Sequence, residues 1–308
     1  MKKIFGIILF IAFTSILFGQ SDYKKYYETV YGAENYLMDE EYDSAAVEYQ
    51  KAFKQVDYVF VKDLMNTTYL SIILKNDSMF VSSLTKAFCE GLEINDPMIV
   101  KNKKIQKYNK SLGNILEEKY DSCRYIYIHT YNLEIRKKLF IFEERDQRYR
   151  SKGLFKKYDR NKYQQMDSIN SIELLNIINK YGFPGPQLVG YIDIYATANP
   201  IGIVIHHLNK EEMPDSILIE AIYDGKYQPN AYAQMYDYHH TNYTLEIPNN
   251  KRLQTKAYYW LNPTSVDNDS LAKKVNNYRK EILMPTIQFS QKKYNYLKKH
   301  HDNYFILY

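Results

Sequence analysis

The spacing of small and aromatic residues between Gly32 and Val56 (GAENYLMDEEYDSAAVEYQKAFKQV) constrains the fold more than any other feature of the chain. Ala33 and Tyr36 would lie on a first helix. On a second helix the alternation of small and aromatic side chains recurs every three to four residues, at Tyr42, Ala45, Tyr49 and Ala52. Small side chains at this spacing let two antiparallel helices pack closely. The segment therefore predicts a helical hairpin.

This hairpin resembles a tetratricopeptide repeat, in which helix pairs stack into an extended scaffold. A weaker second copy follows in residues 79–88 (MFVSSLTKAF). One repeat cannot bury its own apolar face, so the helices between residues 22 and 92 should stack on each other or on the segment that follows. We predict a tetratricopeptide-like segment over residues 22–109, with an ordinary helical bundle as the alternative.

Most of the remaining sequence also shows the periodicity of apolar residues that is typical of helices. Apolar residues at helical spacing predict helices over residues 131–153 and 159–181, and a closing helix over residues 270–285. Alternating residues on both sides of a Pro-Asn-Asn turn predict a β-hairpin within residues 242–261.

The predicted fold is therefore mainly α. Tetratricopeptide-like helical hairpins come first, and a mostly helical domain with a small β-hairpin follows over residues 110–287. Residues 288–308, rich in tyrosine and lysine, are interpreted as a C-terminal tail.

The first residues have the pattern of a secretory signal peptide. Lys2 and Lys3 precede an apolar run from Ile4 to Phe18, which is short for a membrane span, and polar residues follow. We predict a signal peptide over residues 1–20 and export to the periplasm or the extracellular space, with no stable membrane span after cleavage. An uncleaved anchor is the alternative.

The net charge does not support nucleic-acid binding. Without Lys2 and Lys3, 39 of the 41 basic residues remain against 36 acidic residues, a formal net charge of +3. The basic run over residues 101–110 is interpreted as a solvated helix face or loop. The 33 Tyr residues are interpreted as a composition bias, because clustering rather than number indicates a binding surface.

The chain has two cysteines, Cys89 and Cys123. Export would permit a disulfide bond between them, but spacing alone does not establish the pairing, and two buried free thiols are the alternative. Motifs for zinc, phosphate or dinucleotide binding are absent from the sequence, so no metal and no cofactor are expected.

Two adjacent histidines, His206 and His207, end an apolar run that begins at Ile201. Asn199-Pro200 before the run suits a helix start, and a strand is the alternative. On a helix, His207 would lie at the edge of the apolar stripe and His206 nearly opposite to it. His207 is therefore the better candidate for a functional role.

Several short motifs occur in order over about residues 110–287: Asp146-Gln147 and Arg150, Asp167 and Asn170, Gly182-Phe183-Pro184, Gly190, His207 and Asp237. This order resembles the bacterial domain-of-unknown-function family numbered six-six-two-four. The chain departs from the family pattern at His206, which replaces a glutamine, and at Tyr238, which replaces an arginine. The family carries no known activity, so the resemblance implies no function.

Asp237 and His240 are three residues apart and would share a helix face, so the carboxylate could orient the imidazole. With His207, and with Asp146 or Asp167, they could assemble an acid/base site. Asp146 could instead pair with the basic residue four positions later and only stabilise a helix. The polar candidates for binding are Gln147, Arg150, Asn170 and His240.

The sequence favours an exported interaction or ligand-binding protein with a helical-repeat scaffold, which would contact a protein or peptide partner through its helical segment. The alternative is an envelope hydrolase that uses His207 and Asp237 in acid/base or metal-assisted chemistry.

Overall fold

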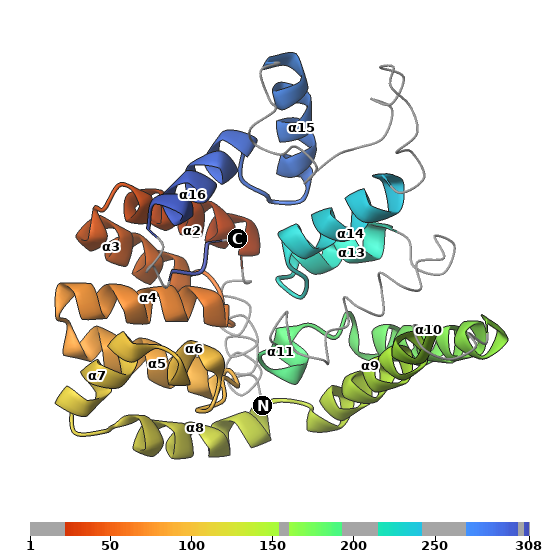
Figure 1. Cartoon of the computed structure of the whole chain (residues 1–308), viewed down its shortest axis with the longest axis horizontal. Helices are drawn as coiled ribbons and strands as arrows, with labels where there is room; N and C mark the ends of the chain where they lie inside the picture. Colours follow the sequence, from red (N-terminus) through yellow and green to blue (C-terminus); the bar gives the residue numbers. More distant parts are fainter. Residues whose placement is uncertain (1–21, 154–159, 193–214, 242–268, 301–304, 308) are drawn as a thin grey trace, which may run out of the picture.

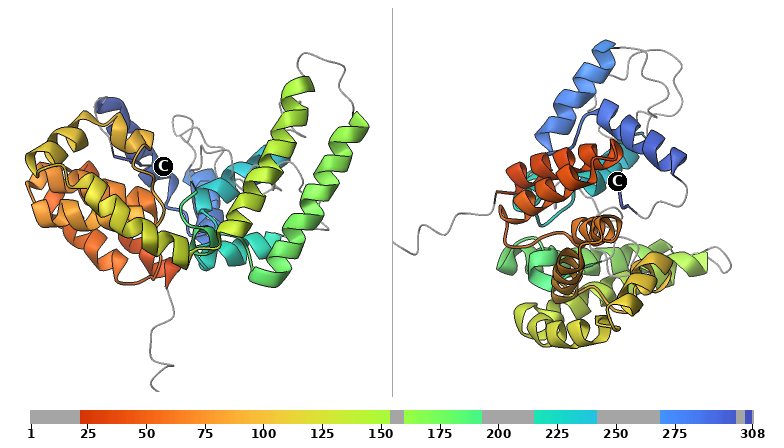
Figure 2. Two further views of the ribbon diagram at one scale, coloured as in Figure 1. Left: turned by 90° about the horizontal axis from the view of Figure 1, so that it is seen from below. Right: turned by 90° about the vertical axis from the view of Figure 1, so that its left-hand side faces the viewer.

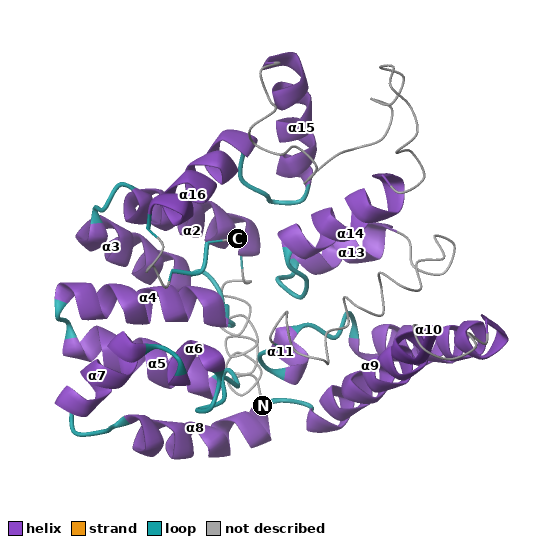
Figure 3. Ribbon diagram, viewed as in Figure 1, coloured by secondary structure: helices purple, strands orange, loops and turns teal. Residues whose placement is uncertain are grey.

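In the part of the chain that it describes, the computed structural model consists of helices and the loops that connect them (Figure 1). The structure describes residues 22–153, 160–192, 215–241, 269–300 and 305–307. Within these ranges there is no strand (Figure 3), which confirms the predicted mainly α fold. The predicted β-hairpin within residues 242–261 and the pair His206 and His207 lie outside the described residues.

The helices from α2 to α8 form a stack of helix pairs on the left of Figure 1. α2 packs against α3, α4 against α5 and α5 against α8, and α3 also contacts α4. Each pair is therefore covered by the next one along the chain. The bounds of these helices are α2 (Tyr23–Met38), α3 (Tyr42–Phe53), α4 (Val61–Leu74), α5 (Asp77–Cys89), α6 (Pro97–Val100), α7 (Lys103–Ser111) and α8 (Leu116–Thr130).

Small side chains allow the close packing of α2 and α3. Ala33 in α2 is completely buried, as are Ala45 and Ala52 in α3. Tyr49 is also fully buried, whereas Tyr36 remains 37% exposed. The predicted hairpin is confirmed, with Tyr36 outside its buried face.

Polar side chains cap the starts of α2 and α5. The Asp22 carboxylate accepts a hydrogen bond from the Lys25 amide at 3.0 Å, and the Asn76 side chain accepts one from the Met79 amide at 2.9 Å. These N-caps satisfy amide groups that have no partner within their own helix. At the end of α4, Lys75 adopts a left-handed conformation (φ 53°) that reverses the chain toward α5.

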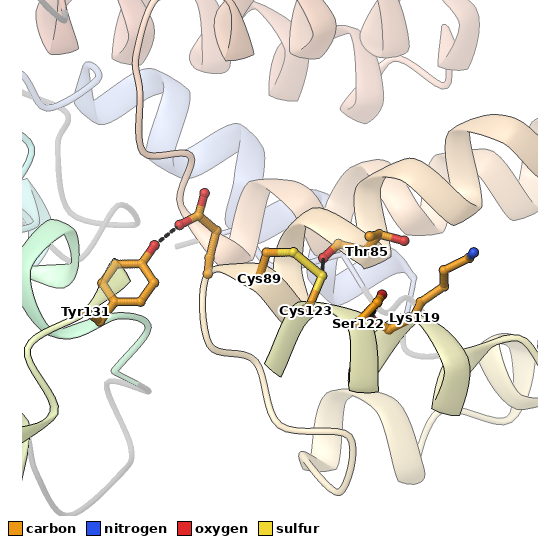
Figure 4. The surroundings of a disulfide bond; sticks show 7 residues. Thr85, Cys89, Lys119, Ser122, Cys123 and Tyr131 are labelled. Atoms are coloured by element: carbon orange, nitrogen blue, oxygen red, sulfur yellow. Dashed lines mark hydrogen bonds between the residues drawn. A yellow bond between two sulfur atoms is a disulfide. The ribbon is translucent and has the colours of Figure 1, made fainter. Parts of the chain in front are cut away.

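A disulfide bond joins Cys89 at the end of α5 to Cys123 in α8 (Figure 4). The predicted boundary near residue 110 coincides with the end of α7, but the helical stack continues beyond it, because α8 packs on α5 and is cross-linked to it. The thiols are therefore paired rather than free.

The remaining helices form the right-hand and upper parts of Figure 1. α9 and α10 coincide with the helices predicted over residues 131–153 and 159–181, and together they make a long hairpin that projects from the molecule (Figure 2, left). The bounds are α9 (Leu133–Gly153), α10 (Arg160–Tyr181), α11 (Pro186–Val189), α13 (Asp215–Tyr223), α14 (Pro229–Thr241), α15 (Asp269–Glu281) and α16 (Ile287–Lys299).

The segment assigned to a C-terminal tail returns to the N-terminal stack. α16 packs against α2, as the right-hand view of Figure 2 also shows. Beyond α16, Phe305 and Leu307 are buried, and the Asn66 side chain in α4 forms hydrogen bonds with both the amide and the carbonyl group of Ile306, at 2.7 and 3.1 Å. The two ends of the described chain therefore share one core.

We expect the double variant Cys89→Ser/Cys123→Ser to lose about 2–4 kcal/mol of unfolding free energy, because the bond closes a loop with a sequence separation of 34 residues. Urea unfolding of the oxidised chain measures this loss. Dithiothreitol should lower the midpoint of the native chain and leave the variant unchanged. An unchanged midpoint of the native chain after verified reduction would contradict this stabilising role.

Candidate ligand-binding site

Four charged side chains from three helices meet in the interior beside α2. Glu34 of α2 is completely buried, and so is nearly all of Asp63 in α4. The Lys62 ammonium group lies 2.6 Å from an Asp63 oxygen and 3.2 Å from a Glu34 oxygen, and the Lys293 ammonium group of α16 lies 2.5 Å from the other Glu34 oxygen. Two acids and two bases thus form one buried ion cluster: Glu34, Lys62, Asp63 and Lys293.

The pKa shifts within the ion cluster reflect competition between burial and charge pairing. Burial alone would raise the pKa of Glu34, but Lys293 and Lys62 lower it below its usual value. Burial raises the pKa of Asp63, and Lys62 offsets this only in part. Burial lowers the pKa of Lys293 even though Glu34 stands beside it. Glu34 is thus the well-compensated acid, whereas the charge of Lys293 is compensated incompletely.

Tyrosines surround the ion cluster. The Tyr26 hydroxyl donates a hydrogen bond of 2.6 Å to Asp63. The Lys293 ammonium group lies 5.4 Å from the centre of the Tyr31 ring, and the Tyr31 hydroxyl donates to the carbonyl oxygen of Leu283 at 3.0 Å. Burial raises the pKa of both tyrosines far above neutrality, so their hydroxyl groups stay protonated and act as donors.

A cavity of about 310 Å³ adjoins the ion cluster. Residues far apart in the sequence line it: Tyr27, Tyr31, Phe60, Lys62, Gln228, Pro229, Asn230, Arg279, Met284, Pro285, Ile287, Ser290, Lys293, Tyr294, Leu297 and Leu307. Three of these side chains are cationic and none is an Asp or a Glu. The cavity therefore offers positive charge at its surface, while Glu34 and Asp63 stand behind the wall.

Two lining residues show how the wall is built. Arg279 is 5% exposed, and its guanidinium group donates to the Pro285 carbonyl oxygen and to the Ser290 hydroxyl oxygen, both at 2.6 Å. These bonds hold the loop between α15 and α16 in place. Tyr27 is 5% exposed, and its hydroxyl has no hydrogen-bond partner among the described residues. This oxygen has almost no accessible surface, so it lies within the wall and does not open into the cavity.

Asp167 and Asp237, the catalytic candidates whose side chains are described, are not among the described lining residues of this cavity. His207 lies outside the described residues, and Asp146 lies in α9 with its side chain outside the description. Asp167 is half-buried in α10. Asp237 is 6% exposed in α14, where it and Asp215 add to the effect of burial in raising the pKa of Tyr236.

Of the candidates for binding, Asn170 has a described contact. It is completely buried in α10, and its amide donates to the Phe142 carbonyl oxygen of α9 at 3.0 Å, which joins the two helices of the hairpin. Gln147 and Arg150 lie in α9 and His240 in α14, but their side chains are not described.

No metal centre is present in the described part of the chain, where no three His, Cys, Asp or Glu side chains are placed to hold an ion. Likewise, none of the described helices is long and apolar enough to cross a membrane.

Sequence reasoning missed the ion cluster and the cavity. A signal was present, because Glu34 follows Ala33 on a face that must be buried, and Lys62-Asp63 begins an apolar helix. Lys293, however, stands 259 positions after Glu34, and no local pattern connects them.

Comparison with known proteins finds no matching family model, no similar curated protein and no similar solved structure. The resemblances to the six-six-two-four family and to the tetratricopeptide repeat therefore stay predictions.

We expect Lys293→Met to lower the unfolding free energy by about 3–5 kcal/mol, because Glu34 keeps its buried charge and loses one of two cations. Lys292→Met is the matched control. The neighbouring Lys292 pairs with Asp39 at the surface, where both side chains are more than a third exposed, so its loss should cost under about 1 kcal/mol. Denaturant unfolding compares the two, and equal losses would refute the structural role of the Lys293 pair.

Proposed function

We propose that this chain is an exported ligand-binding protein, in which the helical stack and α16 form a scaffold around a small-molecule cavity. The observation that carries the proposal is the cavity of about 310 Å³ whose largely apolar wall also includes the cationic residues Lys62, Arg279 and Lys293. Small-molecule sites are commonly apolar clefts of about 300–1,000 Å³ with a few converging polar groups. The volume and the lining both fit that description.

The energetics of buried charge support a role in binding. Replacing a buried ion pair by apolar residues of similar size is often neutral or stabilising, so such a pair is poorly explained by stability alone. Here the ion cluster places Lys62 and Lys293 at a cavity surface that otherwise consists largely of aromatic and aliphatic groups. Orientation of a polar ligand group would account for this arrangement.

Two observations support export. The chain begins with a basic and apolar segment of the signal-peptide type. In addition, Cys89 and Cys123 are joined by a disulfide, a bond found mainly in oxidising compartments such as the periplasm and the extracellular space.

The protein or peptide partner and the hydrolase alternative remain predictions from the sequence. The hydrolase alternative depends on His207, which lies outside the described residues. No contact of the described residues favours it over ligand binding.

A fragment screen tests the proposed function. With methyl-labelled protein, we expect NMR shifts of Met284, Ile287 and Leu297 on addition of compounds that bind the cavity, because their side chains line it. Gln228→Trp, which places an indole in the same cavity, should abolish these shifts. Gln164→Trp, at an exposed position of α10, should preserve them. The proposal fails if a chemically diverse library leaves all three methyl signals unchanged.

A further inference from the structure

We propose that the helical stack carries a peptide-binding site next to Asn66, and that this site takes an extended segment of a partner protein with consecutive large apolar side chains. In the structure the chain's own residues 305–307 occupy the site. The inference goes beyond the proposed function, because it concerns a second site and a peptide rather than a small molecule.

One side chain of α4 holds the backbone of this segment. The Asn66 side chain accepts a hydrogen bond from the Ile306 amide at 2.7 Å and donates one to the Ile306 carbonyl oxygen at 3.1 Å. In an extended chain the N–H and C=O groups of one residue point to the same edge, so a single side-chain amide can pair with both. Any peptide that adopts the same extended conformation can make this contact.

Asn66 is held in the orientation that the contact requires. Its Nδ2 also donates to the Tyr49 hydroxyl oxygen of α3 at 3.1 Å, and both side chains are buried. Of the described residues, only Ile306 donates to the Asn66 Oδ1. A buried polar atom without a partner is costly, so Asn66 favours an occupied site over an empty one.

The side chains of the segment contact apolar surfaces of the stack. Phe305 and Leu307 are buried, and the Phe305 ring packs edge-on against Tyr69 of α4, with 5.5 Å between the ring centres. Ile306 lies at the wall of a cavity of about 150 Å³ that methionine side chains of α4 and α6 also line. The site therefore combines a backbone contact with apolar surfaces for three consecutive side chains.

The segment leaves space beside it. The cavity of about 150 Å³ adjoins Ile306, and the cavity of about 310 Å³ next to the ion cluster adjoins Leu307. A peptide with longer apolar side chains at these two positions would bury more surface than isoleucine and leucine do, and buried apolar surface strengthens binding. The site therefore has room for a partner's segment that displaces the chain's own.

Fluorescence anisotropy of the full chain with a labelled peptide of residues 302–308 (DNYFILY) tests this inference. The tethered segment competes at an effective concentration on the order of millimolar. We therefore compare the native chain with the full-length double variant Phe305→Ala/Leu307→Ala, whose own segment should bind weakly. The double variant should bind the peptide at least about tenfold more tightly than the native chain.

N-methylation of the peptide at the position of Ile306 is the diagnostic change, because it removes the N–H group that Asn66 accepts. It should weaken binding to the double variant about tenfold. On the protein side, Asn66→Leu added to the double variant should have a similar effect. Asn170→Leu is the matched control, because Asn170 is also fully buried but joins α9 and α10 away from the site.

The inference is wrong if the folded double variant does not bind the peptide, or if N-methylation leaves the affinity unchanged. Should the double variant fail to fold, NMR of the native chain decides. A millimolar excess of peptide should then shift the Ile306 methyl signals to solvent-exposed values, and unshifted signals would overturn the proposal. A native dimer that is lost in the double variant would assign the site to a second copy instead of a partner protein.

Discussion

The buried carboxylate of Glu34 is the group on which the arrangement of the two chain ends depends. It is completely enclosed in α2, and its two oxygens receive ammonium groups from Lys62 in α4 and Lys293 in α16. An uncompensated charge at this depth would cost several kcal/mol. The docking of α16 is therefore a condition for burying Glu34. The loop from α15 to α16 lines the cavity together with α2. The shape of the cavity therefore also depends on the docking of α16.

A second set of contacts attaches the middle of the chain to the helical stack. Tyr131, just before α9, donates a hydrogen bond to the buried Glu90 carboxylate that follows α5 (Figure 4). The Tyr191 amide, beyond α11, donates to the Glu90 carbonyl oxygen at 2.6 Å. Glu90 directly follows Cys89 of the disulfide, so one short segment links α5, α8 and the start of the α9–α10 hairpin. Loss of the disulfide would loosen the support of this junction as well as the stack.

The polar interior thus has two regions with different roles, one around Glu90 and one around Glu34. Near Glu90 the polar groups bond mainly to backbone and to neighbouring side chains, as expected of a joint between elements. Near Glu34, by contrast, Lys62 and Lys293 of the ion cluster also line the cavity. The second region borders the cavity, and it is there that we propose a ligand binds.

The sequence by itself determined the mainly α class, the α2–α3 hairpin through Ala33, Ala45 and Ala52, and the helices α9 and α10, because these depend on residues three and four apart. It did not determine any part of the cavity. Only the tertiary structure decided that Cys89 pairs with Cys123, that the helical stack continues past residue 110, and that the segment from residue 288 onward carries Lys293 to Glu34. The physical reason is range: helical periodicity is local, whereas a buried charge selects its partner by distance in space, regardless of separation along the chain.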